Sequence, residues 1–290
     1  MKKNLLFLIF TLLLFASSQI SAKELTISTN SWIGYTPLFY ANEKGYLKEL
    51  DIKLLTSDTL SEAAAIYKEN KADMVTTTQH EYYAIQKSGY SIIPVILFDR
   101  SYGADMVLSN KSIAELQKAK KIDVYLKTDS INAQVLEDFI NYYHIDKNKL
   151  TLINTEPSQL ENLKPQKNKN MLIVTFVPYN IALQKKGFME LASTKETKVI
   201  VVIDSLCANK ESIIHDKKRL KKLKSIIDKS ILEIQADKRA TYQLIKNYLE
   251  GMNYNDYLDA FSKIEWINKP SKNLLNRIKD MGYDEKYLIK

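Results

Sequence analysis

The stretch TISTNSWIGYTPLFYANEKGYL, residues 26–47, places an apolar strand, a polar loop and an apolar helix in immediate succession. The apolar residues at its start predict a strand over Leu25–Thr29. Pro37–Glu43 predicts a helix that opens with a proline, which the first turn of a helix tolerates. A strand followed by a helix is the repeating unit of sheets whose strands run in parallel. This stretch therefore predicts an α/β fold.

The same unit recurs along the chain, with crossovers of about a dozen residues or more that suit parallel strands. A first set has strands at Leu25–Thr29, Ile52–Leu55, Met74–Thr77 and Ile92–Phe98, with helices at Pro37–Glu43, Ser61–Glu69 and Glu81–Gln86. A second set has strands at Met106–Leu108, Ile122–Leu126, Leu150–Asn154, Met171–Thr175 and Val199–Val202, with helices at Ile113–Lys118, Ile131–Tyr143, Pro157–Lys164 and Tyr179–Lys185. Two α/β sets of similar size indicate two lobes.

From residue 216 onward the sequence predicts helices alone, at Lys217–Lys246, Asn255–Phe261 and Asn273–Met281, which must pack across the lobes already built. The chain has only 7 glycines and 6 prolines and no Gly/Ser-rich linker, so it should cross between lobes through short strand segments. We expect a signal peptide over residues 1–22, lobe I over 23–100 plus 206–290, and lobe II over 101–205.

The first residues have the pattern of a secretory signal peptide. Lys2 and Lys3 precede an apolar run from residue 5 to residue 16, and Ser21 and Ala22 form a small-residue cleavage site. The run is shorter than the roughly 20 residues of a transmembrane helix, although an uncleaved anchor is the alternative. We therefore expect a periplasmic protein.

The chain contains a single cysteine, Cys207, far from the cleavage region. This leaves no thiol at the mature N-terminus for a lipid anchor, and no internal disulfide can form. The mature protein is therefore expected to be free and soluble, and to be stabilised by its core alone. A chain of this length buries most of the surface that its unfolded form exposes.

The formal net charge is +8, but basic and acidic residues are interspersed. The densest basic run lies at Lys217, Lys218, Arg219, Lys221, Lys222 and Lys224, and apolar residues recur beneath it at helical spacing, at Leu220, Leu223, Ile227, Ile231 and Ile234. This pattern predicts a solvated helix face, with a polyanion site as the alternative. Export argues against nucleic acid as a partner.

Four segments in order resemble one known family. They are residues 26–47, SYGADMVLSNKSIAELQKAKKIDVYLKTDSINAQVLEDFI at 101–140, TFVPYNIALQKKG at 175–187 and WINKPSKNLLNRIKDMGY at 266–283. Together they resemble the sulfonate-binding and thiamine-precursor-binding branch of type 2 periplasmic solute-binding proteins. The resemblance implies a two-lobed fold in which each lobe is a mostly parallel sheet flanked by helices.

It also implies a function. Such a protein is the substrate-binding component of an ABC transporter, a monomer that captures a small organic solute in an interlobe cleft by hinge closure and then docks on a membrane permease. A sulfonate, a pyrimidine or thiamine precursor, or a related nitrogen compound would be its ligand.

In open α/β sheets, ligands bind beyond the carboxyl ends of the strands. This rule selects the candidate ligand-binding residues, which are Trp32, Tyr35, Thr77, Thr78, His80, Tyr102, Asp105, Thr128, Ser130, Asn132, Pro178 and Tyr179. Trp32 and Tyr35 have flat faces that suit an aromatic or cationic group, or else they pack in the core. Asp105 is expected either to pair with a ligand amine or to fix the hinge.

Two helix starts leave alternatives open. Residues 127–130 precede a helix that begins near Ile131, so free amides there could bind a carboxylate, sulfonate or phosphate. The alternative is an ordinary N-cap made by Asp129 or Ser130. His80 is a candidate pocket donor, but Glu81 beside it has the place of a first-turn acid.

No pairing of a nucleophile with a base indicates an enzyme. The sequence lacks Gly-x-Ser-x-Gly, a Gly-rich phosphate loop and His-Glu-x-x-His, and Cys207 has no neighbour that could activate it. The three histidines lack metal-ligand spacing, so neither a metal nor a cofactor is expected. Two rivals stay open: a sensory ligand-binding subunit for a membrane receptor or kinase and, less favoured, a pyrimidine synthase.

Overall fold

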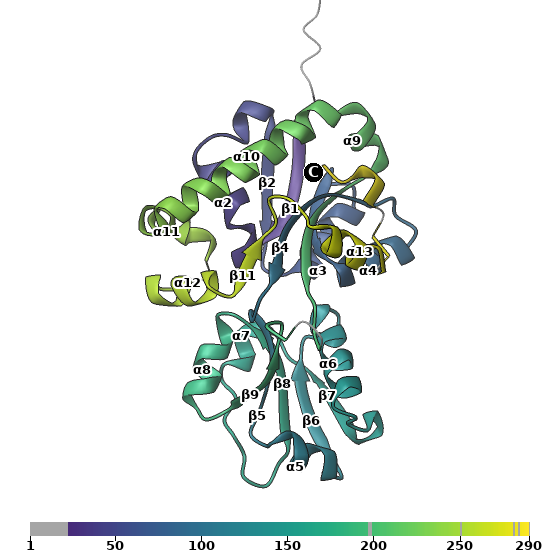
Figure 1. The fold of residues 1–290 in the computed structure, drawn as a ribbon, viewed down its shortest axis with the longest axis vertical. Coiled ribbons are helices and arrows are strands. Elements are labelled where there is room, and N and C mark those ends of the chain that lie inside the picture. The colour runs from purple at the N-terminus through teal and green to yellow at the C-terminus, as the bar shows by residue number, and fades with distance from the viewer. Residues whose placement is uncertain (1–22, 197–198, 250, 281, 284, 290) are drawn as a thin grey trace, which may run out of the picture.

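The computed structural model describes residues 23–290 except 197–198, 250, 281, 284 and 290, so the predicted signal peptide lies outside the described residues. The chain forms two lobes, one above the other in Figure 1, and each is built on its own β-sheet. It passes between the lobes twice, between Ser101 and Asp105 and between Ser193 and Ile203. The predicted α/β fold with two sheets is confirmed.

The larger lobe contains a six-stranded sheet in the order β11-β4-β10-β3-β1-β2. Strands β1 to β4 run in one direction, and β10 and β11 run in the opposite one. Most strands are therefore parallel in direction, as predicted. The strands are β1 (Leu25–Asn30), β2 (Ile52–Ser57), β3 (Met74–Thr78), β4 (Ile93–Ser101), β10 (Ile203–Ala208) and β11 (Ile264–Trp266).

The smaller lobe contains a five-stranded sheet in the order β7-β6-β8-β5-β9, in which β5 alone opposes the direction of the others. The lobe boundaries predicted after residues 100 and 205 fall inside β4 and β10, and the division of the chain between the lobes stays a prediction. The strands are β5 (Asp105–Ser109), β6 (Ile122–Leu126), β7 (Leu150–Asn154), β8 (Met171–Phe176) and β9 (Met189–Ser193).

Helices flank both sheets (Figure 1). Those of the first half are α2 (Thr36–Glu43), α3 (Leu60–Lys68), α4 (Gln79–Lys87), α5 (Ile113–Lys118), α6 (Ile131–Tyr142), α7 (Pro157–Leu160) and α8 (Tyr179–Lys185). The C-terminal helices lie mainly against the larger lobe, where α10 and α11 pack on α2. They are α9 (Lys210–His215), α10 (Lys217–Ala236), α11 (Lys238–Ile245), α12 (Tyr254–Phe261) and α13 (Lys272–Asp280).

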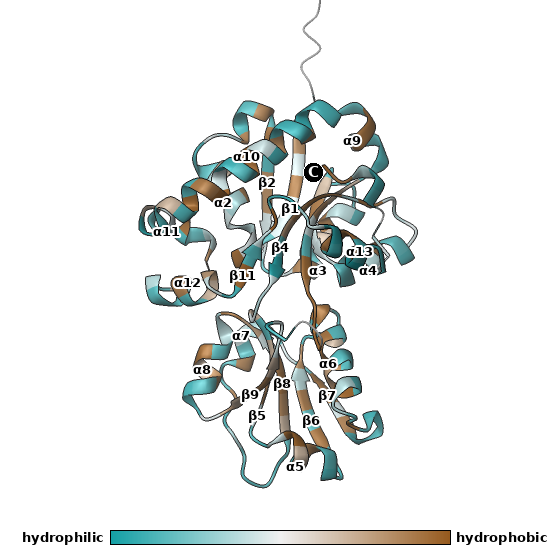
Figure 2. Ribbon diagram, viewed as in Figure 1, coloured by the Kyte–Doolittle hydropathy of each residue, from teal (hydrophilic) through white to brown (hydrophobic). Residues whose placement is uncertain are grey.

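Apolar residues concentrate on the strands of both sheets and on helix faces turned toward them (Figure 2). The predicted apolar stripe of α10 is buried along its whole length, at Leu220, Leu223, Ile227, Ile231 and Ile234. The helical spacing of the sequence therefore identified the packed face correctly.

The structure differs from the prediction in the extent of two helices and in the position of one lysine. The helix predicted over Lys217–Lys246 is interrupted at Asp237, because that carboxylate accepts a hydrogen bond from the amide of Ala240 (2.9 Å) and so caps α11. The helix predicted over Pro157–Lys164 ends at Leu160. Lys224 was predicted on the solvated face of α10 but is buried.

The strand predicted at Val199–Val202 is wrong. These residues lie in the second passage between the lobes, where Ile200 and Val202 are buried among apolar residues of the smaller lobe. The strand begins one residue later, at Ile203, and belongs to the other sheet as β10. β9 and β11 were not predicted either, because both are edge strands with exposed positions and a weak apolar pattern.

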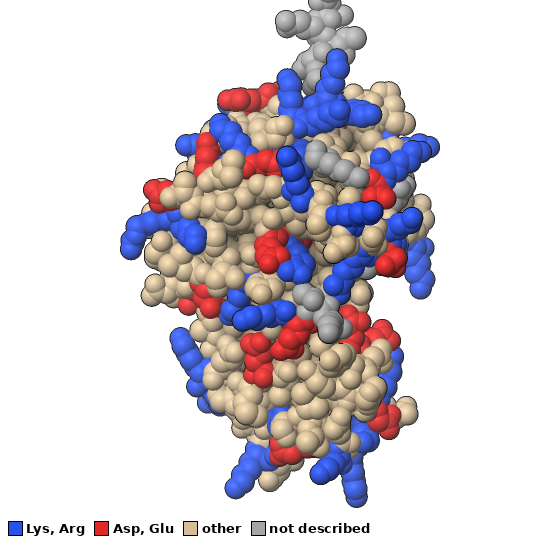
Figure 3. All heavy atoms as spheres, in the orientation of Figure 1, with Lys and Arg blue, Asp and Glu red and all other residues tan. Residues whose placement is uncertain are grey.

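Charged side chains of both signs are scattered over the visible face of each lobe (Figure 3). On α10, Lys217, Lys218, Lys221 and Lys222 are exposed, as the pattern of a solvated helix face predicts. Within the described residues, no helix has the length and apolarity needed to cross a membrane.

Candidate ligand-binding cleft

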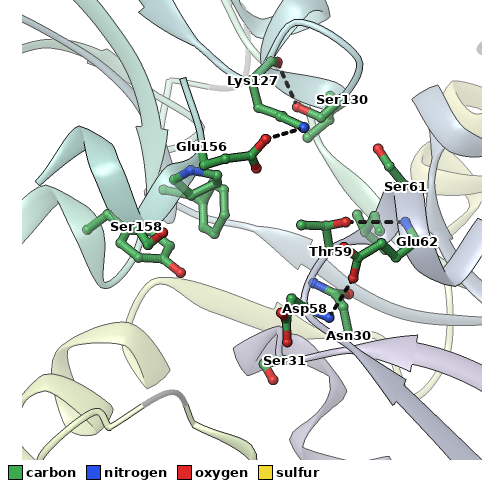
Figure 4. Close-up of a pocket in the computed structure, with 15 residues that line it drawn as sticks. Asn30, Ser31, Asp58, Thr59, Ser61, Glu62, Lys127, Ser130, Glu156 and Ser158 are labelled. Atoms are coloured by element: carbon green, nitrogen blue, oxygen red, sulfur yellow. Dashed lines mark hydrogen bonds and ion pairs between the residues drawn. The ribbon is translucent and has the colours of Figure 1, made fainter. Parts of the chain in front are cut away.

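The carboxyl ends of strands from both sheets face one another across a cleft between the lobes (Figure 4). The cleft holds a cavity of about 510 Å³. The larger lobe lines it with residues 30–31 at the end of β1 and 58–62 after β2. The smaller lobe contributes residues at or beyond the carboxyl ends of β6, β7 and β8, namely Lys127, Ser130, Ile131, Glu156, Pro157, Ser158, Phe176 and Tyr179. The arrangement follows the carboxyl-end rule in both lobes.

The start of α3 brings two acids to the larger-lobe side of the cleft, where Figure 4 shows them. Thr59 accepts a hydrogen bond from the Glu62 amide (3.2 Å), and the Glu62 carboxylate accepts one from the Asp58 amide (3.0 Å). These bonds satisfy amides at the helix start and fix Asp58 and Glu62 beside the cavity.

The smaller-lobe side carries one lysine that is already paired. The ammonium of Lys127 lies 2.5 Å from Glu156 and 3.4 Å from Asp129. The hydrogen bond to Glu156 is the main cause that raises the pKa of Lys127. At the next helix start, Ser130 accepts a hydrogen bond from the Asn132 amide (3.3 Å) and caps α6, which is the N-cap alternative.

A smaller chamber of about 40 Å³ adjoins the cavity and shares four lining residues with it: Asn30, Leu60, Ile131 and Phe176. Its remaining lining is Trp32, Thr78, Asp105, Val202 and Asp204. Trp32 of the larger lobe meets Phe176 of the smaller lobe edge to face, with ring centroids 6.0 Å apart. Phe176 in turn contacts Tyr179 (5.3 Å), so the chamber has aromatic walls from both lobes.

A buried carboxylate, Asp204, lines this chamber, and a second, Asp99, lies directly behind it in the sheet. Asp204, at the amino end of β10, lies directly opposite Asp99 of β4 and Thr78 of β3 in the strand register. Tyr35 donates a hydrogen bond to Asp204 Oδ1 (2.5 Å). Burial raises the pKa of Asp99 to about 8, and burial together with the charge of Asp99 raises that of Asp204 well above its ordinary value.

Asp105 lies where the chain first enters the smaller lobe. Its amide donates to Ser101 Oγ (3.1 Å), and its carbonyl accepts from the Thr194 amide (2.9 Å). Ser101 and Thr194 are hydrogen-bonded to each other (2.6 Å), which ties the two passages together. The backbone of Asp105 thus belongs to the connection between the lobes, while its side chain lines the chamber. Burial raises its pKa to about 6.

Two glycines shape this region. Gly103, between the lobes, has a φ of +98°, a conformation that favours glycine. Gly34 brings the backbone against Asp99, since a Cβ there would overlap Asp99 Oδ2 and Trp32 Nε1. Gly34 therefore keeps Trp32 and Asp99 in close approach.

Five of the twelve predicted site residues line the cavity or the chamber: Trp32, Thr78, Asp105, Ser130 and Tyr179. Trp32 is also buried in the core, and its role in binding stays a prediction. Tyr35 lies behind the chamber and positions Asp204. Thr78 caps α4, with Glu81 at the reciprocal position of the capping box, so Glu81 is the first-turn acid.

The other predicted residues line neither space. Thr77 is buried beside Ser205 and Cys207, and Asn132 donates to the Val174 carbonyl (3.4 Å). His80 contacts Thr78 through its amide, Tyr102 lies under the Arg100 guanidinium, and Thr128 donates to Asn154. Pro178 follows a cis peptide bond before α8. Their roles in binding stay predictions.

Sequence reasoning missed several lining residues. The segments 58–62 and 156–158 follow predicted strands, so the carboxyl-end rule applied to every strand would have found them. Asp204 had no such signal, because it lies at the amino end of a strand that runs against its neighbours. Within the described residues, no cluster of side chains suits a metal ion.

The fold and the cleft are those of a two-lobed binding protein, and residues 32–240 match the model of the family described as NMT1/THI5 like. The chain belongs to this family. The resemblance predicted from the sequence is thereby confirmed. A search of curated protein sequences finds no match.

Solved structures share the fold. The periplasmic aliphatic sulphonate binding protein SsuA from Escherichia coli has 12% identity and a TM-score of 0.73, with 90% of this chain and 86% of that chain covered. The alkanesulfonate-binding protein SsuA from Xanthomonas axonopodis pv. citri, bound to MOPS, has 11% identity and a TM-score of 0.69, covering 92% and 94%. The periplasmic nitrate-binding protein NrtA from Synechocystis has 10% identity and a TM-score of 0.62, covering 81% and 69%.

Proposed function

We propose that this protein is the substrate-binding component of an ABC import system, and that as a periplasmic monomer it captures a small organic solute and presents it to a membrane permease. The observation that carries the proposal is the cavity of about 510 Å³, which both lobes line with the ends of their strands. A cavity of this size suits a small organic molecule. The fold shared with periplasmic binding proteins supports the same function.

Binding would act through hinge closure. Only two short passages join the lobes, and they are held to each other at Ser101 and Thr194. The lobes also touch across the cleft, where Ser61 Oγ donates to the Asp129 carbonyl (3.1 Å) and Trp32 meets Phe176. A solute that contacts both lobes would add to these contacts and so favour the closed arrangement.

The proposal does not include catalysis. A pyrimidine synthase or another enzyme would need a reactive group at the cleft, but the thiol of Cys207 is buried away from it, and burial raises its pKa to about 11. The sensory role uses the same cleft. Reconstituted permease that gains ATPase activity when liganded protein is added would support transport over sensing.

Thermal-shift screening followed by small-angle scattering tests the proposal. We expect a solute that raises the melting temperature to reduce the radius of gyration, since it would hold the lobes together. Tyr179→Ala, in the cleft, should weaken binding about tenfold, because it removes an aromatic contact surface. Tyr142→Ala is the matched control, because Tyr142 is half exposed on the outer part of α6 and should not matter.

The same scattering curves give the molecular mass, which we expect to be that of a monomer. A solute that binds tightly without contracting the protein, or with equal affinity for the Tyr179→Ala variant, would contradict binding in the interlobe cleft.

A further inference from the structure

Buried carboxylates at and beside the chamber include side-chain oxygens that the fold leaves without a hydrogen-bond donor. Asp99, Asp105 and Asp204 are only 0%, 3% and 2% exposed. Among the described residues, the Oδ2 atoms of Asp105 and Asp204 find no hydrogen-bond donor, whereas Asp99 has the indole N–H of Trp32 beside it, which lowers its pKa against the effect of burial. A buried carboxylate oxygen without a donor costs free energy, so the fold keeps these oxygens at the expense of its stability.

The strand register keeps these acids close to one another. Asp204 is the cross-strand partner of Asp99, and like charges directly opposite in a sheet repel. The charge of Asp105 also acts on both Asp99 and Asp204.

The unpartnered oxygens belong to side chains that line an open space. Asp105 and Asp204 both line the chamber of about 40 Å³, which opens to the main cavity past Asn30 and Phe176. A single water occupies about 30 Å³ in the liquid, so the chamber has room for one small polar group such as an ammonium or amidinium head. The rest of a ligand would lie in the larger cavity.

Acidic side chains also outnumber basic ones over the whole cleft. Among the described residues that line the two spaces, Lys127 is the only cation, and Glu156 and Asp129 already pair with it. The lining acids are Asp58, Glu62, Asp105, Glu156 and Asp204. A sulfonate or carboxylate would therefore enter an acidic cleft, which is unfavourable at short range in a low dielectric.

The walls fit an organic cation better than a bare ion. Trp32 and Phe176 present aromatic rings to the chamber, and aromatic faces attract cationic nitrogen groups. The main cavity, about 510 Å³, is also far larger than one ion needs.

We propose that the ligand of this protein is a small organic cation whose protonated nitrogen group enters the chamber and donates hydrogen bonds to Asp105 and Asp204. This inference rests on the proposed function, because it names the class of solute that the cleft takes. It separates this chain from the sulfonate-binding and nitrate-binding proteins that share its fold. Because Asp105 also belongs to the hinge, the nitrogen group would hold the two lobes to each other.

Protonation of the free protein gives the inference a second readout. The pKa of Asp99 is about 8 and that of Asp105 about 6, mainly through burial, and Glu81 and Tyr35 face the same acids. A bound cation favours the ionised carboxylates, so cation binding at pH 7 should release protons. An anion or a neutral solute would release none.

A charge-matched panel tests the inference on the mature protein after unfolding and refolding to remove any bound solute. The probes are benzylammonium, benzamidinium and 4-aminopyridinium as cations, benzenesulfonate as the anion, and benzyl alcohol as the neutral analogue. K⁺ and Zn²⁺ are the metal arms. We expect at least one organic cation to raise the melting temperature and to release about one proton in calorimetry at pH 7 in two buffers.

Substitutions at the chamber test whether the cation binds there. Asp105→Asn and Asp204→Asn should each weaken binding of that cation by about tenfold or more, since each removes a charge-assisted hydrogen bond. Asp123→Asn is the matched control, because Asp123 lies on β6, outside both spaces, and should leave affinity unchanged. Melting curves of all three variants establish that they are folded.

The inference is overturned if no organic cation in the panel binds, if benzenesulfonate or benzyl alcohol binds as tightly as the cations, or if the metal ions alone bind. An anion that binds and contracts the protein in scattering would overturn the inference and leave the proposed function standing. Solutes that bind without any contraction would count against the proposed function itself.

Discussion

Two sites in the larger lobe bury a charged side chain, and they treat it differently. Lys224 of α10 is 4% exposed, and its ammonium donates to both carboxylate oxygens of Asp228 (2.6 and 2.7 Å) and to the Asn268 carbonyl (2.7 Å). Asp204 is 2% exposed, yet only one of its oxygens has a donor, from Tyr35.

The difference distinguishes a buried charge that supports the fold from one that can bind a ligand. The ammonium of Lys224 uses all three of its donors, so this residue joins α10 to the C-terminal segment and has nothing left for a ligand. Asp204 keeps an unused acceptor beside an open chamber. A buried charge with a full set of partners therefore stabilises the fold, whereas one with an incomplete set lowers stability and keeps the capacity to bind.

Removing the fully paired charge is the strongest test of this contrast. Lys224→Ala should lower the free energy of unfolding by about 2–3 kcal/mol, because it breaks a buried pair whose acid is partly exposed. Urea unfolding measures the change. Lys221→Ala, on the exposed face of the same helix, should stay within about 0.5 kcal/mol. Equal effects of the two substitutions would show that the buried pair does not stabilise the fold.

Removing the incompletely paired charge should have the opposite sign. Asp204→Asn should raise the free energy of unfolding of the ligand-free protein by about 1–2 kcal/mol at pH 7. The amide keeps an acceptor for Tyr35 and takes up no proton on folding, whereas the raised pKa of Asp204 means that the buried acid must take one up at pH 7. The same urea experiment measures it, and a loss of stability would mean that Asp204 is a structural residue like Lys224.

The pH dependence of stability refines the comparison further. Because the pKa values of Asp99 and Asp105 are raised to about 8 and about 6, above the roughly 4 of an unfolded aspartate, the folded protein binds more protons than the unfolded chain from about pH 4 to about pH 8. Stability of the ligand-free protein should therefore fall as pH rises, by about 1 kcal/mol from pH 6 to pH 7. Calorimetry at both pH values checks this. Asp99→Asn should flatten the dependence, and an unchanged slope would contradict the assignment.

The sequence was most informative where apolar periodicity decides the structure. The buried strands β1, β3 and β8 and the apolar stripe of α10 follow from the spacing of apolar residues alone, because that spacing decides which side chains are buried. It failed at Val199–Val202, where a β-branched run packs beside a strand without joining one. It also failed at Asp237, where one cap divides a continuous helical pattern.

The candidate site was predictable to the extent that it follows strand ends. Trp32, Thr78 and Tyr179 were found because they lie just beyond predicted strands. Asp99 and Asp204 were not, because each lies within a strand and becomes a site residue only through cross-strand pairing. Pairing depends on which strand lies beside which, and a sequence read one element at a time does not contain that information.

The order of strands in the larger sheet also governs when the chamber can form. β10 lies between β3 and β4, yet the chain reaches it only after the whole smaller lobe has been made. Until then β3 and β4 present unpaired edges, and closing so long a loop is slow. A nascent or truncated chain that ends before Ile203 thus holds Asp99 and Asp105 without Asp204, so solute recognition arises only once the polypeptide is nearly complete.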